Sequence, residues 1–585
     1  MIAAIDYETY YDSECTIVEL GIYHYLRHPK SDIYMVSIAT DTGIRYVGHP
    51  KDFDWTSISG PEWTWLSHNA QFDYPVFVRT QELGIGNTCE VKELAAWHDT
   101  ADLTAFLSYP RSLKDASKFL LGVELSKDVR DKMKGQRWEL MTPEFKKEVE
   151  KYALDDAVYC LEIFLQHGHK WPEHEREISR MTREMALRGV PVDIQGLEEA
   201  AETLKLAIWE AKQVIPWAED HPILSLPAAR TQCEKDGIEA PVSFAQNDPE
   251  AEAWEAKYSE QFPWIKAMRS YRKANKHLST VETMLKRAQS NGWMSYGLKY
   301  YGAHTGRDSG DSGWNAQNLP KGEVCGVDVR SKVKAPEGYT LAIVDLSQIE
   351  PRVLHWLAKD EETLQYIREI PDLYEAFARA WGLYTDERPL KEVDQKLRHA
   401  TKTMALGLQY GMGANKFSAV AGIEAGEANR LVKLYRSKNK KVTKLWKDLE
   451  EVLRKTAIRG EGNATVDLPS GRSLTYRNVT IDGDSLTAII PRLGKLLPLK
   501  FWGGILTENA VQAMARCVFM DRCLEIEKLG IQIVMRVHDE VVCVVPEATA
   551  ESDLNAIISV MSTAPTWAPG LPLAAEGGLS KVYKK

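Results

Sequence analysis

The chain has 585 residues, of which 44% are hydrophobic and 27% are charged, and its formal net charge is −10. This composition is ordinary for a globular protein, and the length allows roughly three or four domains. No run reaches the roughly 18 apolar residues that a membrane span needs. The first residues contain acids and no basic segment, which argues against a signal peptide. The eight cysteines form no CxxC pair, so neither disulfides nor structural zinc are expected, and a reducing cytosol fits.

The N-terminal block, to about residue 175, alternates two kinds of hydrophobic pattern. Residues 2–11, 33–40 and 44–49 are typical of strands, and residues 144–171 are typical of a long helix. Because strands that alternate with helices usually form layered sheets, we expect a mixed α/β domain here.

Carboxylates recur in this block at positions that could bring them together. Asp6 and Glu8 are two apart on the first strand, so both side chains leave the same face. Two such acids repel unless a cation lies between them. Asp73 lies just inside a helix start, and Tyr152 and Asp156 are one helical turn apart. Four acids and a tyrosine from three segments could therefore converge on two Mg²⁺ ions.

The middle of the chain is rich in predicted helix. Residues 197–215 and 259–290 repeat apolar residues at three- and four-residue spacing, and residues 238–252 between them are typical of a loop. Two basic groups are present: Lys266, Arg269, Arg272, Lys273 and Lys276, and then Lys438, Lys440, Lys441, Lys444 and Lys447. A solvated helix face is the simplest interpretation of each group alone.

Two predicted strands toward the C-terminus carry acids at their tips. Residues 339–345 form an apolar run that ends at Asp345, before a predicted helix. Residues 533–537 and 541–545 flank His538, Asp539 and Glu540, a pattern that predicts a hairpin. Aspartates on adjacent strand ends could hold two cations about 4 Å apart, as two-metal phosphoryl transfer requires. A helical region is expected from about 357 to 456, and strands return at 463–478.

A basic segment lies between these two strands in sequence. Arg398, Lys402, Leu406 and Tyr410 recur every four residues and would form one stripe on a helix. Two cations one turn apart suit a triphosphate, and the tyrosine ring could stack beneath a base. The alternative is an amphipathic helix with a basic face toward solvent.

The motifs in combination resemble those of a known family. DLSQIEPRV, RHATKTMALGLQYG and VHDEVV, in this order, look like motifs A, B and C of family A DNA polymerases, and TGR and NAQNLP precede them. In the N-terminal block, DYE, NAQFD and YALDD resemble the three motifs of DEDDy-type 3′–5′ exonucleases. The resemblance spans nearly the whole chain and is closest to compact phage enzymes of the bacterial DNA polymerase I type.

The resemblance implies a multidomain α/β fold, with a ribonuclease H-like exonuclease domain followed by a right-hand polymerase. We expect the exonuclease domain at 1–178, the helical thumb at 179–295, the palm at 296–356 and 457–585, and the fingers at 357–456.

The resemblance also implies roles for particular residues. Asp345 and Asp539 would hold two Mg²⁺ ions, and Lys402 would also protonate the leaving group. The nucleotide site would comprise Gln348, Glu350, Arg398, Lys402, Leu406 and Tyr410, and DNA contacts would come from Arg307, Asn315, Gln317, His538 and Glu540. In the exonuclease, Asp6, Glu8, Asp73 and Asp156 would ligate two further Mg²⁺ ions while Tyr152 orients the attacking water. Mn²⁺ could replace Mg²⁺ in either site.

Three features depart from the family pattern. Leu406 occupies a motif B position where family members commonly carry Phe or Tyr. Tyr374 stands where the bacterial enzymes have a phosphate-contacting His. No 5′-nuclease domain precedes Asp6, so removal of flaps or primers would need another protein. The expected partners are primer–template DNA, deoxynucleoside triphosphates and replication proteins such as a helicase and a single-strand-binding protein. We expect a monomer without membrane contact, in the host cytoplasm if phage-encoded.

Three alternatives remain open from the sequence. A single-subunit RNA polymerase shares the motif B spacing, but Glu350 and the exonuclease motifs argue against it. A catalytically silent DNA-binding scaffold would not need every expected metal carboxylate. An exonuclease with a vestigial polymerase half would not need Asp345, Arg398, Lys402 and Asp539 together.

Overall fold

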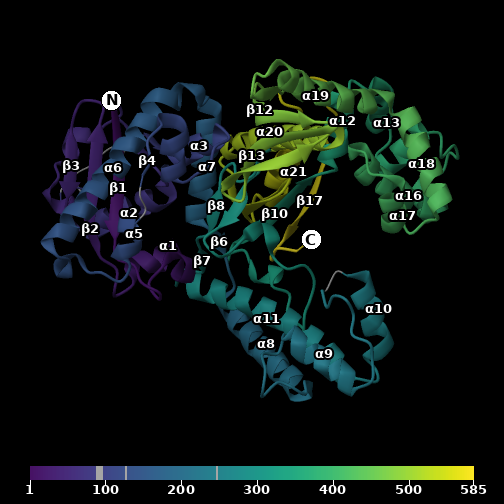
Figure 1. The fold of residues 1–585 in the computed structure, drawn as a ribbon, viewed down its shortest axis with the longest axis horizontal. Coiled ribbons are helices and arrows are strands. Elements are labelled where there is room, and N and C mark those ends of the chain that lie inside the picture. The colour runs from purple at the N-terminus through teal and green to yellow at the C-terminus, as the bar shows by residue number, and fades with distance from the viewer. Residues whose placement is uncertain (87, 89–95, 126–127, 246–247, 585) are drawn as a thin grey trace.

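The computed structural model describes residues 1–86, 88, 96–125, 128–245 and 248–584 of the chain. Figure 1 shows a central sheet region from which three parts extend: the N-terminal region, a helical arm formed by α8 to α11, and a second helical part formed by α13 to α18. The seven cysteines within the described residues are free thiols, and Cys89 lies outside them. No helix in the described part is long and apolar enough to cross a membrane.

The N-terminal region is a five-stranded mixed sheet with helices packed on it. The strands are β1 (Ile2–Thr9), β2 (Ile33–Thr40), β3 (Arg45–Gly48), β4 (Thr64–Ser67) and β5 (Ala96–Asp99), in the order β3-β2-β1-β4-β5. β1 runs antiparallel to β2 and parallel to β4, and β4 is parallel to β5. The packed helices include α1 (Ile17–Arg27), α2 (Ala70–Glu82), α3 (Thr100–Phe106), α4 (Leu113–Ala116), α5 (Asp128–Met133) and α6 (Pro143–His167). The expectation of a mixed α/β layer is confirmed.

The helical arm is built on two long antiparallel helices, α8 (Ile194–Val214) and α11 (Pro263–Arg287). Their apolar residues recur every three or four positions and are buried where the helices meet. Two further helices complete the arm: α9 (Leu226–Lys235) and α10 (Pro249–Tyr258). The expectation of a loop over 238–252 is therefore wrong at its end, because Asp248 caps α10 and Pro249 occupies its first position, where proline favours a helix.

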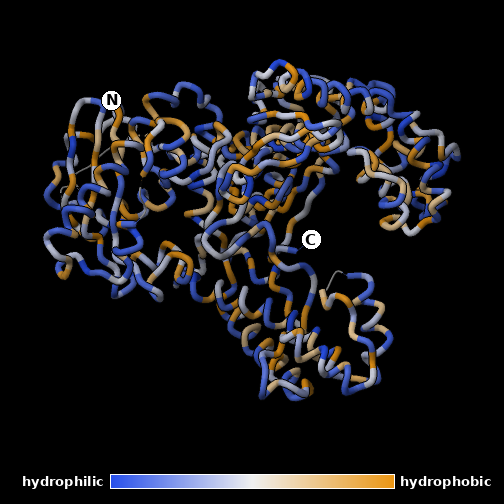
Figure 2. Tube along the Cα trace, in the orientation of Figure 1, coloured by the Kyte–Doolittle hydropathy of each residue, from blue (hydrophilic) through white to orange (hydrophobic). Residues whose placement is uncertain are grey.

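The central sheet has four antiparallel strands in the order β15-β16-β10-β17. Their bounds are β10 (Tyr339–Leu346), β15 (Gln532–Val537), β16 (Glu540–Pro546) and β17 (Ala575–Ser580). Both predicted strands and the predicted hairpin are confirmed. The long helix α20 (Gly503–Lys528) packs behind this sheet with α21 (Ala550–Met561), and Figure 2 shows hydrophobic residues along the sheet strands.

The second helical part and a further sheet lie between β10 and α20 in sequence. The helices are α12 (Ile349–Leu357), α13 (Glu361–Glu369), α14 (Leu373–Ala380), α15 (Leu390–Val393), α16 (Gln395–Gly407), α17 (Ala414–Ala421), α18 (Ala425–Lys438) and α19 (Lys440–Arg459). The further sheet consists of β11 (Ala464–Asp467), β12 (Ser473–Asp482), β13 (Ser485–Arg492) and β14 (Lys495–Phe501) in sequence order. The predicted helical region and the return of strands are both confirmed.

One long helix joins the N-terminal region to the central region. This helix, α7 (Glu173–Arg188), contacts β5 of the N-terminal sheet as well as β15 and α20 of the central region. The short strand pairs β6 (Val190–Pro191) with β7 (Trp293–Met294) and β8 (Gly297–Lys299) with β9 (Ser309–Asp311) lie nearby. A domain boundary at residue 178 therefore falls inside a continuous helix.

Candidate active sites

The N-terminal carboxylates come from three elements that pack on one another. Asp6 and Glu8 alternate with buried neighbours on β1, Asp73 lies in the first turn of α2, and Tyr152 and Asp156 lie on α6. Both α2 and α6 contact β1. A direct bond fixes part of the set, because the backbone N–H of Tyr7 donates to Asp73 Oδ1 at 3.0 Å. All five predicted residues line one cavity of about 570 Å³.

The electrostatics of this cavity are those of crowded acids. Burial, and then the charges of Asp73, Glu8 and Asp156, raise the pKa of Asp6 well above its ordinary value. Burial, followed by the charge of Asp156, raises the pKa of Glu8 to about 8, although the cation Arg130 opposes the shift. Asp6 Oδ2 is buried and makes no hydrogen bond to any described residue. Such a set is costly without a cation and suits one.

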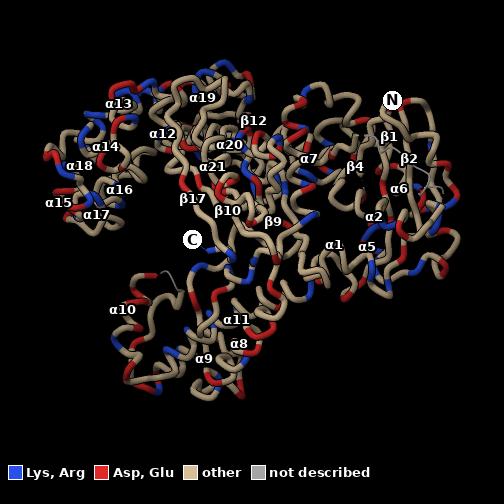
Figure 3. Tube along the Cα trace, turned by 180° about the vertical axis from the view of Figure 1, so that it is seen from behind, with Lys and Arg blue, Asp and Glu red and all other residues tan. Residues whose placement is uncertain are grey.

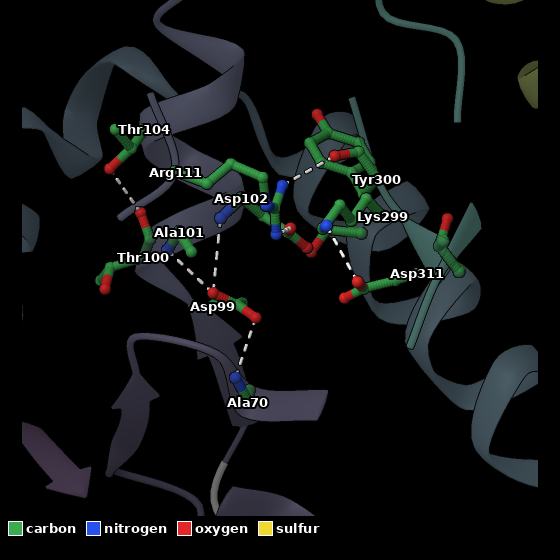
Figure 4. A network of polar contacts seen from close by, with 12 residues as sticks. Ala70, Asp99, Thr100, Ala101, Asp102, Thr104, Arg111, Lys299, Tyr300 and Asp311 are labelled. Carbon is green, nitrogen blue, oxygen red and sulfur yellow. Dashed lines mark hydrogen bonds and ion pairs between the residues drawn. The ribbon is translucent and has the colours of Figure 1, made fainter. Parts of the chain in front are cut away.

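The cavity also has a basic side that the sequence did not reveal. Arg130, on α5, acts to lower the pKa of Glu8, and its backbone carbonyl accepts a hydrogen bond from the Tyr11 hydroxyl. Figure 4 shows Arg111 reaching from the N-terminal region to Asp102 and to the carbonyl of Tyr300. Tyr300 follows β8, so residues far along the chain help to close the cavity.

The start of α2, which positions Asp73, is held by an acid that was not predicted. Asp99, at the end of β5, accepts hydrogen bonds from the N–H groups of Ala70 at 2.8 Å and Ala101 at 2.8 Å (Figure 4). It thus supports two helix N-termini at once. The signal in the sequence is an aspartate that directly follows a short apolar strand, which is too common to single out.

The central sheet brings the second predicted pair together. Asp345 stands opposite Glu540 in the β10–β16 register, and Asp539 is the adjacent residue in the hairpin turn. The N–H of Leu346 donates to the carbonyl of Asp539 at 3.0 Å, which ties the two strand ends. Asp345 and Asp539 are both half-buried. Glu540 turns inward, is 1% exposed and accepts from the Tyr583 hydroxyl at 2.8 Å.

Within the described ranges, no three His, Cys, Asp or Glu side chains are already arranged as a metal site. Two observations nevertheless fit divalent cations. The N-terminal set is an acid cluster with a buried carboxylate oxygen on Asp6 that lacks a partner. The central pair supplies two carboxylates, which is the number that Mg²⁺ commonly takes from a protein when substrate phosphates supply other ligands.

Arg398 and Lys402 lie on α16 beside the first turn of α14. Arg398 Nε pairs with Asp372 Oδ2 at 2.7 Å. Its guanidinium lies 5.3 Å from the centre of the Tyr374 ring, and the Lys402 ammonium lies 6.0 Å from the same centre. Lys402 is exposed, while Tyr374 is 9% exposed and sits in the local apolar core. One aromatic ring therefore faces both predicted phosphate-binding cations.

The predicted stripe is only partly helical. Leu406 is on α16 and 50% exposed, but the helix ends at Gly407, and Tyr410 follows in a separate 3₁₀ turn. Gly411 ends that turn in the left-handed region at φ 79°, and glycine at both positions weakens continuation of the helix. The prediction of one helical stripe through Tyr410 is thus wrong.

Tyr410 instead meets a predicted partner from α12. Its hydroxyl donates to Glu350 Oε2 at 3.1 Å, and Arg307 Nη2 lies 2.5 Å from Glu350 Oε1. Burial and the Glu350 charge raise the pKa of Tyr410, so the hydroxyl remains a donor. Gln348 precedes α12 in the left-handed region, with φ 46°.

The other predicted DNA contacts lie in two loops. Asn315 accepts from the N–H of Gln317 at 3.0 Å and so caps a 3₁₀ turn, while Gln317 is half-buried. His538 is exposed at the hairpin tip, with φ 60°.

A buried ionic cluster behind the TGR turn was also missed. Glu175 on α7 accepts from Arg516 Nη1 and from the Tyr300 hydroxyl, both at 2.6 Å. Arg516 Nε donates to the carbonyl of Gly306 at 3.0 Å, next to Arg307. Burial alone would raise the pKa of Glu175, but Arg516 and Arg472 lower it to about 2. These residues are up to 341 positions apart, so local sequence gives no signal for them.

The fold and these sites define a chain with two carboxylate centres, one in the N-terminal sheet and one at the tips of the central strands. Residues 248–462 match the sequence profile of DNA polymerase family A. A DNA polymerase of Bacillus phage SP02 is 32% identical over 280 residues, which cover 44% of this chain and 43% of that protein. The thermostable DNA polymerase I of Thermus filiformis is 28% identical over 429 residues, 70% of this chain and 48% of that protein.

The chain spans about half the length of the curated relatives it matches. Among solved structures, the POL domain of Pol1 from M. smegmatis, in complex with DNA primer-template and dNTP, aligns with a TM-score of 0.69. That alignment covers 99% of this chain and 95% of the other at 17% identity, so it shows a shared fold. The segment that matches the DNA polymerase family A profile contains both Asp345 and Arg398.

Proposed function

We propose that this protein is a DNA-templated DNA polymerase with a 3′–5′ proofreading exonuclease on the same chain, acting in DNA replication. The observation that carries the proposal is the β10–β16 register, in which Asp345 stands opposite Glu540, the residue after Asp539. The backbone bond from the N–H of Leu346 to the carbonyl of Asp539 supports it. A phage origin is part of the proposal, because the 32% identical polymerase comes from a phage.

In the polymerase site, Asp345 and Asp539 would hold two Mg²⁺ ions. Bound there, the ions would lower the pKa of the primer 3′-hydroxyl and neutralise charge on the phosphates. Arg398 and Lys402 would bind the triphosphate, and Lys402, which is exposed, would give a proton to the leaving group. Mn²⁺ could occupy the same ligands.

Nucleotide selection would rest on the Glu350–Tyr410 contact. The 3.1 Å hydrogen bond fixes a carboxylate against the tyrosine, which leaves little room for a ribose 2′-hydroxyl. Gln348 and Leu406 would complete the nucleotide site. Arg307, Asn315, Gln317, His538 and Glu540 would support the primer–template, with Arg307 exchanging its Glu350 contact for the DNA.

In the exonuclease site, Asp6, Glu8, Asp73 and Asp156 would hold two metal ions, while Tyr152 orients water. The mixed sheet order β3-β2-β1-β4-β5, with acids on its first strand, supports a ribonuclease H-like fold for this region. Tyr152 suits the role because burial, Asp156 and Glu8 raise its pKa and keep its hydroxyl protonated.

The proposal assigns the exonuclease to 1–178, the thumb to 179–295, the palm to 296–356 and 457–585, and the fingers to 357–456. It includes a monomer in the host cytoplasm that uses primer–template DNA and deoxynucleoside triphosphates. Accessory proteins such as a helicase and a single-strand-binding protein would act with it.

The test is extension of a 5′-labelled primer on a template with Mg²⁺, with and without the four deoxynucleotides. We expect lengthening with deoxynucleotides and shortening without them, and loss of both on chelation. Equal extension with ribonucleotides would instead indicate an RNA polymerase. Shortening without any lengthening would reduce the central region to a DNA-binding platform and contradict the proposal.

A further inference from the structure

A cleft beside the Tyr410 turn has no role in the sites above. It has a volume of about 360 Å³ and lies between α18, α19 and the start of α20. Its lining residues are Arg436, Thr443, Trp446, Lys447, Glu450, Trp502 and Gly503. Trp502 is 40% exposed, which is unusual for so large an apolar ring.

Two glycines at the start of α20, Gly503 and Gly504, allow α19, the Trp502 ring and the Tyr410 turn to pack closely against this helix. A Cβ atom on Gly503 would collide with the backbone of Trp446, and one on Gly504 would collide with both the Trp502 ring and the carbonyl of Tyr410. The N–H of Gly503 donates to Glu450 Oε2 at 2.8 Å, which fixes the start of α20 against α19. The cleft is therefore a packed feature of the fold.

The cleft is continuous with the turn that carries Tyr410. Trp446 Nε1 donates to the carbonyl of Gln409 at 3.0 Å. A Cβ atom on Gly411 would meet the Trp502 ring, so this ring lies against the backbone directly after Tyr410. A strand that passes the Tyr410 ring could reach the cleft within one or two nucleotides.

The surrounding charge is basic. Arg436 and Lys447 line the cleft, and Lys440 and Lys441 are exposed in the first turn of α19, which contains no acid. Figure 3 marks the Lys and Arg positions along the backbone, including those of α19. Cations at a helix N-terminus oppose the helix dipole, so helix stability does not explain them. The one acid in the lining, Glu450, already bonds Gly503 and Arg454. One member of the second basic group of the sequence, Lys447, thus lines the cleft together with Arg436.

We propose that this cleft binds unpaired template DNA just ahead of the base pair being formed. One base would stack on Trp502 or Trp446 while Arg436 and Lys447 contact the flanking phosphates. Aromatic rings beside cations are the usual chemistry for binding a single strand without regard to sequence. The inference rests on the proposed polymerase function, because that function requires a single-stranded template at this point.

The test measures binding of the full-length protein, in EDTA, to primer–templates that differ only in the length of the 5′ template overhang. EDTA prevents both extension and degradation. We expect an overhang of six nucleotides to bind about tenfold more tightly than a blunt end, since one stacked base has about this effect. Trp502→Ala and Lys447→Glu should each remove most of this gain.

Two matched variants control for general effects. Trp209→Ala removes another exposed tryptophan, on α8, and Lys455→Glu reverses a charge two turns further along α19. Both should keep the full overhang dependence. Because Trp502 touches the Tyr410 turn, Trp502→Phe serves as a conservative variant that should retain most of the gain.

A second readout places the base itself. With 2-aminopurine at single positions of the overhang, stacking on indole should quench one position in the wild type, and Trp502→Ala should restore its emission. Overhang dependence that persists in both Trp502→Ala and Lys447→Glu would overturn the inference, as would equal loss in the Trp209 control. Failure of the wild type to bind primer–template at all would instead overturn the proposed function.

Discussion

The two carboxylate centres differ in how much of the site the protein itself provides. The N-terminal centre gathers Asp6, Glu8, Asp73 and Asp156 around one cavity, and their mutual repulsion raises the pKa of Asp6. The central pair lies half-buried at strand tips and turn. The first centre therefore has enough acids to hold cations alone, whereas the second needs substrate phosphates to complete the coordination.

The largest expected effect comes from the centre with fewer ligands. Asp345→Asn should lower primer extension about a thousandfold or more, because an amide lacks the negative charge with which the carboxylate would bind a metal ion. Degradation of single strands should stay near the wild-type rate. Glu337→Gln, at the other end of β10 in an exposed turn, is the matched control and should extend normally. Wild-type extension by Asp345→Asn would mean that this pair is not catalytic.

Substitution in the N-terminal carboxylate centre should have the opposite effect to Asp345→Asn, removing degradation and leaving primer extension. The double variant Asp6→Asn with Glu8→Gln should abolish degradation of a labelled single strand and leave extension intact. Asp155→Asn changes the acid next to Asp156 on the same helix and should keep both activities. If the double variant also failed to extend primers, the two centres would not be independent.

A smaller effect concerns the helix between the centres. Glu175→Gln removes the charge that pairs with buried Arg516, and this should lower the free energy of unfolding by about 3 kcal/mol. The folded-state pKa of about 2 is below the ordinary value of 4.5, so this stabilisation is present above pH 4.5 and is lost as the pH falls toward 2. Thermal unfolding at pH 7 and at pH 3.5 should show the difference shrinking in acid. Glu173→Gln, which changes an exposed acid on the same helix, should unfold like the wild type at both pH values.

The difference between the two carboxylate centres can also be tested without DNA, by measuring how Mg²⁺ changes the melting temperature. Mg²⁺ in excess should raise the melting temperature of the N-terminal region by a few degrees, since a ligand that binds only the folded state stabilises it. The Asp6→Asn, Glu8→Gln variant should lose this shift, and Asp345→Asn should keep it. Loss of the shift only in Asp345→Asn would reverse our assignment of the metal-holding centre.

The elements on which these sites stand were predictable because their signals are local. The strand that ends at Asp345, the hairpin around Asp539 and the α6 face with Tyr152 all follow from side-chain periodicity. Tyr410 was misplaced because the periodic pattern continues through Gly407, and only the backbone shows where the helix ends. The family resemblance, and not the periodicity, pointed to its partner Glu350.

Contacts between distant segments could not be predicted in this way. Glu175 with Arg516, and Arg111 with the carbonyl of Tyr300, join residues 341 and 189 positions apart. Their energies depend on burial and on which cations the fold brings near, and neither appears in a single sequence. The aromatic cleft was hidden for the same reason, because Trp446 and Trp502 are on separate elements.

The smallest expected effect concerns Tyr374, whose ring faces both Arg398 and Lys402. If the ring face holds these cations in place, Tyr374→Phe should keep the wild-type KM for deoxynucleotides. Tyr374→Leu should raise that KM about three- to tenfold with little change in kcat, because the cation–π attraction is lost while the apolar volume remains.

Steady-state extension at varied deoxynucleotide concentration separates this role from two others. If the hydroxyl contacted phosphate directly, Tyr374→Phe would be as impaired as Tyr374→Leu. If the residue only filled the core, Leu and Phe would behave alike, and both would keep the wild-type KM. Only a rise confined to the leucine variant is consistent with the ring as the feature that orients the cations. That result would show that an uncharged side chain, Tyr374, positions the substrate-binding cations beside the central carboxylate pair. The N-terminal centre, in contrast, relies on its own acids.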